Sequence, residues 1–253
     1  SIRVVQAKQF AWMKSRFLAN SLNELPRHLK WRGFSFTLVS MSDDKKYSVQ
    51  RKPQREIFDS QEIYALLDSE FVAHVGFADL DTGMPFVIPL GFVRDGDRIL
   101  LHGSTGSRLF MQMSQGMEIC VTVTRINALV SARTPAVSSM NYESVMIFGK
   151  VKVLRDDEKI EAMKQLSNKL IPGIWDYAVL PSAKDYAGTV IVELALDKVT
   201  AKSRKGGPVD SPEHVALDIW AGTIPIERKL GIPITAEDSS VKEIPDHIKN
   251  RTL

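Results

Sequence analysis

The spacing of apolar residues changes along the chain from a helical period to a period of two. Residues 59–62 (DSQE) match a helix N-cap followed by a carboxylate, and apolar side chains from Ile63 onward follow at helical spacing. Over residues 71–77, apolar residues instead occupy every second position, up to a turn-forming stretch at 79–83. The pattern therefore predicts a short helix followed by a strand.

Strands joined by tight turns dominate the pattern that follows. We expect strands at 85–93, 98–102, 118–125, 144–154 and 189–197. Between them lie a short helix at 107–114 and a longer one that begins at Asp156, stops at Pro172-Gly173 and buries a stripe of Ile160, Met163, Leu166 and Leu170. Because strands outnumber helices, we predict a mainly β (α+β) fold, an antiparallel barrel with peripheral helices.

Residues 1–40 differ from the rest in charge, because seven basic side chains stand against one acid, Glu24. A basic, acid-poor segment of this kind resembles a mitochondrial presequence, whereas Met41 and the polar residues after it read like a natural N-terminus preceded by an extension. A structured accessory segment is a third reading. We expect a basic leader (1–49), a barrel domain (50–230) and a C-terminal tail (231–253), in a protein that is cytoplasmic, or mitochondrial if the leader is a presequence.

Charge and composition exclude several classes of function. The whole chain carries +3, so the residues beyond 40 carry about −3, which argues against a nucleic-acid-binding core. No stretch approaches the roughly 18 consecutive apolar residues of a membrane span. The histidines show no chelating spacing, and the single cysteine, Cys120, which we expect to be buried, rules out a disulfide framework. Redox chemistry would therefore need a bound cofactor.

An expected strand leads into residues 103–108 (GSTGSR), and an expected helix follows them. Glycines let a backbone approach an anion, the first N–H groups of a helix point outward, and Arg108 offers a fork of donors that can grip a phosphate. The same stretch could be a plain N-cap turn with a surface arginine. It lacks the Gly-Lys-Ser/Thr of a P-loop and the spacing of a dinucleotide-binding fold. Taken alone, the loop is weak evidence of an anion site.

Four separated motifs give this loop its context. Residues 85–90 (PFVIPL) precede a DGD turn and residues 100–108 (LLHGSTGSR), and an ICVTVT strand follows. Residues 138–145 (SSMNYESV) then lead into a strand that contains Phe148-Gly149, and residues 219–222 (IWAG) come last. In this order the motifs resemble the pyridoxamine 5′-phosphate oxidase-like flavoproteins, especially their flavin-nucleotide-binding branch related to nitroimidazole reductases. The resemblance covers roughly residues 50–230.

The resemblance implies a homodimer of split β-barrels that binds two FMN molecules at the subunit interface. The strand of Phe86, Val87, Ile88, Pro89 and Leu90 would lie along the isoalloxazine, with its backbone groups reading the ring edge. The ribityl phosphate would face His102, Ser104, Ser107 and Arg108. From the neighbouring strand or subunit, Ser139, Asn141 and Tyr142 would approach the flavin, and Trp220, expected at an apolar helix end, would cover it.

The sequence departs from the oxidases that act on pyridoxamine phosphate. Those enzymes carry basic residues in the strand that matches Phe86–Leu90, and an Arg-x-His signature after the C-terminal tryptophan, and this chain has neither. Leu109 stands where a second basic residue usually follows the phosphate-binding arginine. The grip on the phosphate would then rely on loop hydroxyls, backbone amides, or basic residues such as Lys202 and Arg204. We therefore do not expect vitamin B6 oxidation.

Two functions of different classes remain. The first is an FMN-dependent oxidoreductase that passes electrons to a small-molecule acceptor, with no side chain assigned as an acid–base catalyst. The second is a carrier or sensor that binds flavin or haem without turnover, in which His102 or His74 would reach the iron. Otherwise we expect His74, which alternates onto the less apolar face of its strand, to be a satisfied barrel histidine. A catalytically silent barrel that acts as an interaction module is a weaker third alternative.

Overall fold

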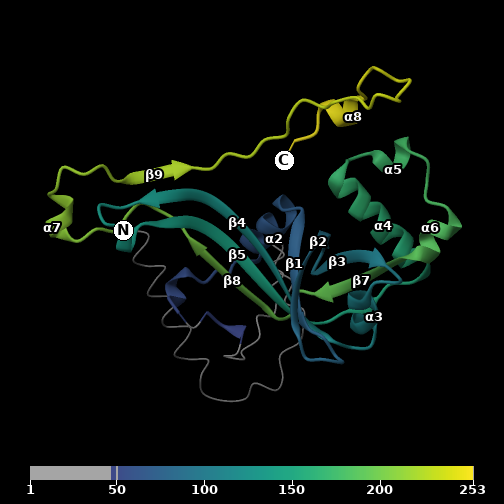
Figure 1. Cartoon of the computed structure of the whole chain (residues 1–253), viewed down its shortest axis with the longest axis horizontal. Coiled ribbons are helices and arrows are strands. Elements are labelled where there is room, and N and C mark those ends of the chain that lie inside the picture. Colours follow the sequence, from purple (N-terminus) through teal and green to yellow (C-terminus); the bar gives the residue numbers. More distant parts are fainter. Residues whose placement is uncertain (1–46, 50, 253) are drawn as a thin grey trace, which may run out of the picture. The chain divides into compact units, whose positions relative to one another are not determined.

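The computed structural model describes residues 47–49 and 51–252, which belong to one compact unit. The leader expected at residues 1–40 lies outside the described residues. Within the described part, a nine-stranded sheet forms the body of the protein, in the order β6-β7-β3-β2-β1-β4-β5-β8, with β9 paired to β4 (Figure 1). The pairings between these strands are antiparallel, and they run through β1 (Val72–Ala78), β2 (Pro85–Asp95), β3 (Arg98–Ser104), β4 (Glu118–Ser131), β5 (Ser139–Lys150), β6 (Lys152–Val153), β7 (Thr189–Ala195), β8 (Val199–Arg204) and β9 (Gly222–Pro225).

Seven helices and two 3-10 turns accompany the described strands of this curled sheet. They are α2 (Ser60–Ser69), α3 (Arg108–Ser114), α4 (Asp156–Leu170), α5 (Ile174–Tyr177), α6 (Ala183–Gly188), α7 (Pro212–Val215) and α8 (Asp246–Lys249), with 3-10 turns η2 (Pro53–Arg55) and η3 (Pro135–Val137). Among the described residues, no helix combines the length and the apolar composition that crossing a membrane requires. The mainly β, split-barrel fold expected from the sequence is confirmed.

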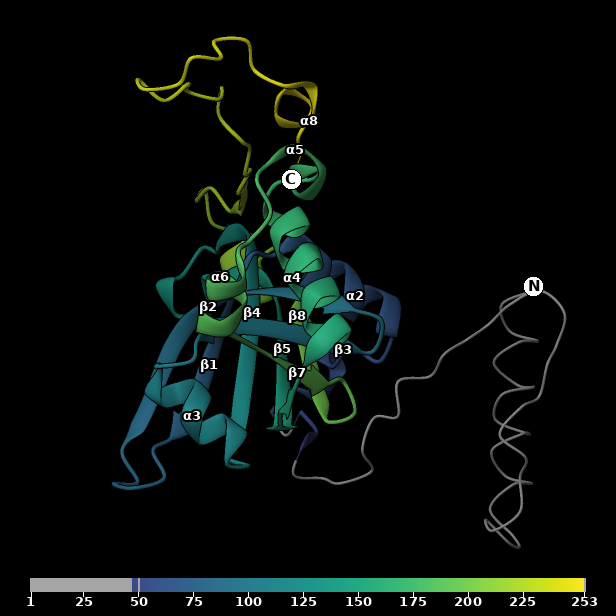
Figure 2. The same cartoon turned by 90° about the vertical axis from the view of Figure 1, so that its right-hand side faces the viewer.

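Strands β3 and β7 are buried on both faces, which explains where α4 lies. Leu101 and Val192 point into the main core of the barrel. Their neighbours Leu100 and Ile191 point the other way and pack in a second cluster with Leu166 of α4. Alternate side chains point to opposite faces of a strand, so the second cluster lies on the outer face of β3 and β7. Helix α4 packs on this face (Figure 2).

The long hairpin of β4 and β5 differs from the expected strands. β4 runs to Ser131 rather than ending at 125, and β5 starts at Ser139 rather than 144, because these ends pair with each other through Val130 and Ser139. This part of the hairpin lies outside the main core, and the exposed Leu129 between the buried Ala128 and Val130 hides the apolar alternation. β5 also ends early, at Lys150, beside Gly149 with its positive φ of 152°.

Two other expectations about helices were wrong. In α4, Ile160 and Leu170 are 43% and 49% exposed, because the face that contacts the sheet is formed by Ala162 and Leu166, one turn apart. Trp220 does not end a helix: α7 stops at Val215, and Trp220 lies in irregular chain with 66% of its surface exposed.

Gly103 offers a test of the packing between β3 and α3. A Cβ atom at this position would overlap the ring of Phe110, which is buried against the barrel core. We predict that Gly103→Ala lowers the free energy of unfolding by about 1–3 kcal/mol, as overpacking does. Denaturant unfolding measures this effect. Gly188→Ala is the matched control, since nothing lies within 4 Å of its added Cβ; equal losses in both variants would contradict the packing described.

Candidate functional site

The residues expected to bind a flavin fall into two groups in this protomer. The first group lies on β2 and on the loop before α3, and the second lies at the start of β5 and near β9 (Figure 1). Val130, which pairs with Ser139, comes eight residues after Thr122, which pairs with His74 of β1. At about 3.3 Å per residue, Ser139 lies roughly 25 Å along the hairpin from the level of Pro89, whereas Tyr142, which pairs with Ile126, lies only about 13 Å along it. The second group therefore lies farther along the hairpin than the first, with Ser139 at its far end.

The sheet opens at the first group. β2 pairs with β1 from Pro85 to Gly91, but with β3 only over Phe92–Asp95. Beyond this point, His102–Ser104 pair with β7 alone. The facing edges of β2 and β3 therefore carry backbone donors and acceptors without a strand partner, and such groups need another partner or water.

Side chains on β2 alternate between the core and the outside. Phe86 stacks on Phe77 with ring centroids 5.4 Å apart, and Ile88 and Leu90 pack against the main core. Val87, in contrast, is 68% exposed on the outer face, which Pro89 shares. The open stretch of β2 thus offers a rigid apolar strand with an accessible backbone edge.

The loop before α3 uses most of its own backbone amides. Thr105 N donates to Gly188 O at 3.0 Å, Gly106 N to Ser104 Oγ at 3.2 Å, and Ser107 N to Ser104 O at 3.0 Å. Gly103 accommodates the Phe110 ring rather than a ligand. Ser107 occupies the N-cap of α3 but makes no side-chain capping bond. An anion here would therefore meet the Ser107 hydroxyl and the first N–H groups of α3.

Arg108 is held in place by a buried carboxylate. Its Nη2 lies 2.6 Å from Asp79 Oδ2 and 3.8 Å from Asp81 Oδ2, while 55% of the Arg108 side chain stays exposed. Burial alone would raise the pKa of Asp79, but hydrogen bonds from Thr82 and Gln112 and the charge of Arg108 outweigh it and lower the pKa to about 2. Asp79 therefore positions Arg108 beside the loop, and an anion would have to share this guanidinium.

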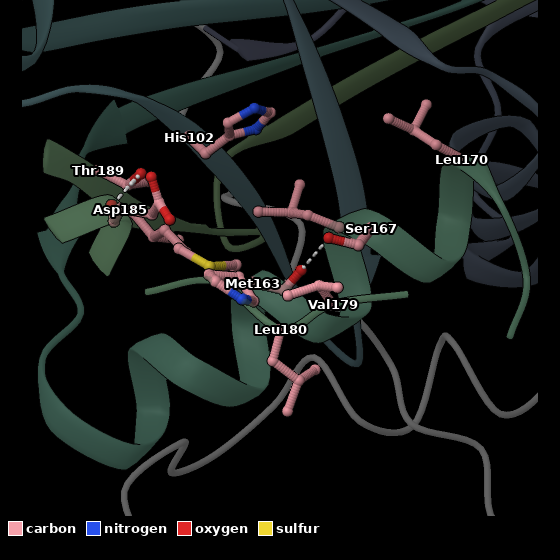
Figure 3. Close-up of a pocket in the computed structure, with 11 residues that line it drawn as sticks. His102, Met163, Ser167, Leu170, Val179, Leu180, Asp185 and Thr189 are labelled. Carbon is pink, nitrogen blue, oxygen red and sulfur yellow. Dashed lines mark hydrogen bonds between the residues drawn. The ribbon is translucent and has the colours of Figure 1, made fainter. Parts of the chain in front are cut away.

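A cavity of about 460 Å³ lies between α4 and the outer face of β3 and β7 (Figure 3). Most of its lining is apolar, and the lining residues are His102, Met163, Leu166, Ser167, Leu170, Val179, Leu180, Pro181, Asp185, Thr189 and Ile191. Two of the hydroxyl groups bond within the wall, Ser167 to Met163 O and Thr189 to Asp185 O, both at 2.9 Å. The size and lining suit a small-molecule pocket, which typically measures roughly 300–1,000 Å³.

His102 links this cavity to β2. In the described part of the chain, no hydrogen bond joins its ring to another residue, and Figure 3 shows it opposite Met163 and Ser167. Burial lowers the pKa of its imidazole, which favours the neutral form that binds metals. The ring also lies beside Gly91, where an added Cβ would be 3.8 Å from His102 Cε1. His102 thus borders both the cavity and the open part of β2.

His74 and Cys120 lie on the outer faces of their strands, so neither packs in the main core. His74 is exposed on the outer face of β1, because the inward positions of that strand belong to Ala73 and Val75. Cys120 is half-buried rather than buried, since it shares the outer face of β4 with Thr122, and burial raises the pKa of its thiol. Neither residue lines the cavity of His102.

The second group of expected residues has structural partners of its own. Asn141 accepts a hydrogen bond from Arg204 at 2.5 Å and donates one to Gly206 O at 3.1 Å. Tyr142 pairs with Arg204 in the ladder of β5 and β8. Around Ser139 and Trp220, the outer surface displays large apolar side chains that are 41–51% exposed: Ile126, Leu129, Met140, Ile224 and Ile226. A contiguous apolar surface of this kind typically marks an interface.

Sequence patterns did not indicate the wall of the cavity or the role of Asp79. Met163 and Leu180 come from a helix and an irregular segment that face the sheet only after folding. For Asp79 the turn signal was visible, but its pairing with Arg108 depends on contacts between segments 29 residues apart. Among the described residues, no cluster of histidine, cysteine and acidic side chains could hold a metal ion by itself.

Comparison with known proteins places this geometry in a family. A family model described as pyridoxamine 5′-phosphate oxidase matches residues 59–203. No curated protein matches the chain. The solved structure of the flavocytochrome Anf3 from Azotobacter vinelandii is 32% identical, with a TM-score of 0.76, over 82% of this chain and 97% of that one.

Two further solved structures are similar. The FAD and haem binding protein from Mycobacterium smegmatis is 31% identical, with a TM-score of 0.74, over 78% of this chain and 97% of that one. A putative 5-nitroimidazole antibiotic resistance protein from Bacteroides thetaiotaomicron is 21% identical, with a TM-score of 0.50, over 68% and 90% of the two chains, and shares the fold.

The pairing of Asp79 predicts how stability depends on pH. Its pKa in the folded protein is about 2, below its ordinary value, so its ionised form stabilises the fold above about pH 4 and this contribution is lost as the pH falls toward 2. Urea unfolding should therefore show a steeper loss of stability between pH 4 and pH 2 in the wild type than in Asp79→Asn. Asp81→Asn, whose side chain is 79% exposed, is the control. Identical pH profiles for the wild type and Asp79→Asn would refute this assignment.

Proposed function

The chain belongs to the pyridoxamine 5′-phosphate oxidase family, and we propose that it is a redox flavoprotein. Membership confirms the resemblance inferred from the four motifs. The observation that carries the proposal is the divided edge of the sheet, where the backbone of β2 over residues 85–91 has no strand partner on one side. A bound flavin supplies the electron transfer that the side chains of the described residues cannot supply.

The residues of the first group would hold the flavin by its FMN portion. The backbone of Phe86–Leu90 would face the ring edge, and Ser107 and Arg108 would contact the phosphate next to the ribityl chain. FMN is the flavin expected from this loop. Because one similar structure is described as FAD-binding, FAD is the second candidate, and it contains the same FMN portion.

The second group would reach the flavin from another subunit. Tyr142 lies about 13 Å and Ser139 roughly 25 Å along the hairpin from the first group, so a homodimer is the arrangement that would bring the far end of the hairpin to one ligand. The exposed apolar residues around Met140 and Ile224 support such an interface. Each flavin would then lie between β2 of one protomer and the β4–β5 hairpin of its partner.

The chemistry proposed is electron transfer to a small-molecule acceptor, without an acid–base side chain. Pyridoxamine phosphate is not proposed as the substrate, because β2 offers no basic residue between Phe86 and Leu90 and no Arg-x-His follows Trp220. A cytoplasmic location and a role as an oxidoreductase rather than a carrier remain part of the proposal. Bleaching of the flavin by NADH or NADPH, followed by turnover with an acceptor, would separate an enzyme from a carrier.

Flavin retention tests the phosphate contact. We predict that Arg108→Gln weakens flavin binding roughly tenfold or more, the effect of losing a charge-assisted hydrogen bond. Flavin released from the purified protein by heat is quantified by absorbance and identified by mass as FMN or FAD. The double variant Asp79→Asn/Arg108→Gln avoids an unpaired buried carboxylate, and Arg155→Gln, an exposed arginine at the start of α4, is the control. Full retention of flavin in both Arg108 variants would exclude this role.

A second component, haem, is favoured by the cavity of His102. The residues fit such a group: the imidazole has no hydrogen-bond partner among the described residues, its lowered pKa favours the neutral ligand form, and Met163 and the leucines give an apolar wall. Two of the similar structures are described as a flavocytochrome and as an FAD and haem binding protein. Haem would supply one-electron exchange next to the flavin, with His102 as the residue that holds the iron.

Haem binding can be tested by spectroscopy. We predict that the wild type, reconstituted with haem, shows a Soret band and that His102→Ala loses it. His74→Ala should keep the band, because His74 lies on the exposed outer face of β1. A Soret band of full intensity in His102→Ala, or its absence in the wild type after reconstitution, would overturn the haem assignment and leave the flavin proposal standing.

A further inference from the structure

Arg204, at the end of β8, is a buried arginine without a carboxylate partner. Only 8% of the residue is exposed, and among the described residues no acid lies within ion-pair distance of its guanidinium. Its Nη1 donates to Asn141 Oδ1 at 2.5 Å and to Gly206 O at 3.4 Å, and its Nη2 donates to Gly207 O at 3.2 Å. Arginine is seldom buried unless its charge is paired, so this position requires an explanation.

The guanidinium borders a pocket of about 310 Å³ that carries excess positive charge. The lining residues are Gln54, Arg55, Glu56, Ser203, Arg204, Lys205, Gly207 and Val209. The lining thus contains three cationic side chains, Arg55, Arg204 and Lys205, and one carboxylate, Glu56. Glu56 accepts a hydrogen bond from Val49 N at 3.2 Å, which directs one of its oxygens to the backbone. The net charge of the lining favours an anionic ligand.

The neighbouring acids are engaged elsewhere. Glu143 lies 2.6 Å from Arg125 Nη2 and 3.0 Å from Asn127 Nδ2, and its other oxygen is 3.9 Å from Lys205 Nζ. Lys205 also pairs with Glu62 at 3.2 Å, through a side chain that is 61% exposed. The charge of Lys205 is therefore partly balanced, whereas Arg55 and Arg204 form no ion pair with a described residue.

Arg204 is also fixed in position. Its backbone pairs with Tyr142 in the sheet, and the carbonyls of the turn at Gly206 and Gly207 hold the guanidinium from the side. A guanidinium has five N–H donors, so the three bonds described leave donors for a further acceptor. A rigid fork of donors next to a basic pocket matches the geometry of a phosphoryl group.

We propose that the pocket of Arg55, Arg204 and Lys205 binds a phosphoryl group of a nucleotide. Val209, 79% exposed at the rim, adds an apolar wall that a nucleoside can contact. The same chemistry has two sources: the adenylate phosphate of a flavin dinucleotide that spans the dimer, or a free nucleotide. The charges and the cavity lie within one protomer, so binding of a free nucleotide does not depend on the flavin proposal, and only the first source rests on it.

Binding of inorganic pyrophosphate and of ADP to the purified protein, measured by titration calorimetry, tests the proposal. We expect saturable binding of both probes to flavin-free wild type, and a loss of roughly tenfold or more in affinity in Arg204→Gln and in Arg55→Gln. Arg204→Lys should retain part of the affinity. Arg155→Gln, an exposed arginine outside the pocket, should bind as the wild type does.

Each outcome is informative even where Arg204→Gln does not fold, because Arg55 and Lys205 lie nearer the surface and their variants test the same pocket. Binding of neither probe to the wild type, or equal binding to the wild type and Arg55→Gln, overturns the proposal. If protein loaded with a dinucleotide flavin no longer binds pyrophosphate while stripped protein does, the flavin is the source. If both forms bind it, the ligand is a free nucleotide. Absence of flavin in the cell-derived protein would sink the proposed function but leave this titration unaffected.

Discussion

The central constraint in this fold is that β2 pairs with β1 along seven positions but with β3 along only four. Buried or half-buried backbone groups need partners, so the divergence of β2 and β3 after Phe92 and Leu101 leaves an edge that solvent or a ligand must satisfy. Pro85 and Pro89 reduce the number of unsatisfied donors on β2, since proline has no N–H. The loop between β3 and α3, which leads to Arg108 and its partner Asp79, lies at the end of this opening. The open edge of the sheet and the loop proposed to bind the phosphate therefore form one region.

The divergence of β2 and β3 also has a consequence for the outer face of β3. Because β3 leaves β2 and continues beside β7, its outer face requires a cover, and α4 supplies it through Ala162 and Leu166. The cover is incomplete near His102, where a cavity of about 460 Å³ remains. The open edge of β2 and the cavity under α4 therefore share His102 as a boundary. In a redox protein, two cofactors placed on the two sides of such a residue would be close enough to exchange electrons, which is why the flavin and haem proposals are compatible.

The core strands could be predicted from the sequence because buried apolar residues occupy every second position in them, as at Ala73, Val75, Val121 and Val123. The same signal failed at the end of β4, where the exposed Leu129 stands between the buried Ala128 and Val130 and hides the alternation. It also failed at Trp220, which lies in irregular chain. The loop at 103–108 was recognised, but its internal bonds and the pairing of Arg108 with Asp79 depend on tertiary contacts. The period placed His74 on the less apolar face of its strand, which is the exposed face in the structure.

In the proposed arrangement each flavin lies between two protomers, and subunit complementation is the sharpest test of this shared site. Arg108→Gln alters the first group and Trp220→Ala alters the second, so each homodimer carries two impaired sites. Co-expression gives mixed dimers, which are separated by two different affinity tags. If the site is shared, one site in each mixed dimer has neither change, and flavin should bind there with wild-type affinity. If the site belongs to one protomer, every site carries one change, and the absence of any wild-type affinity in the mixed dimer would rule out a site shared between protomers.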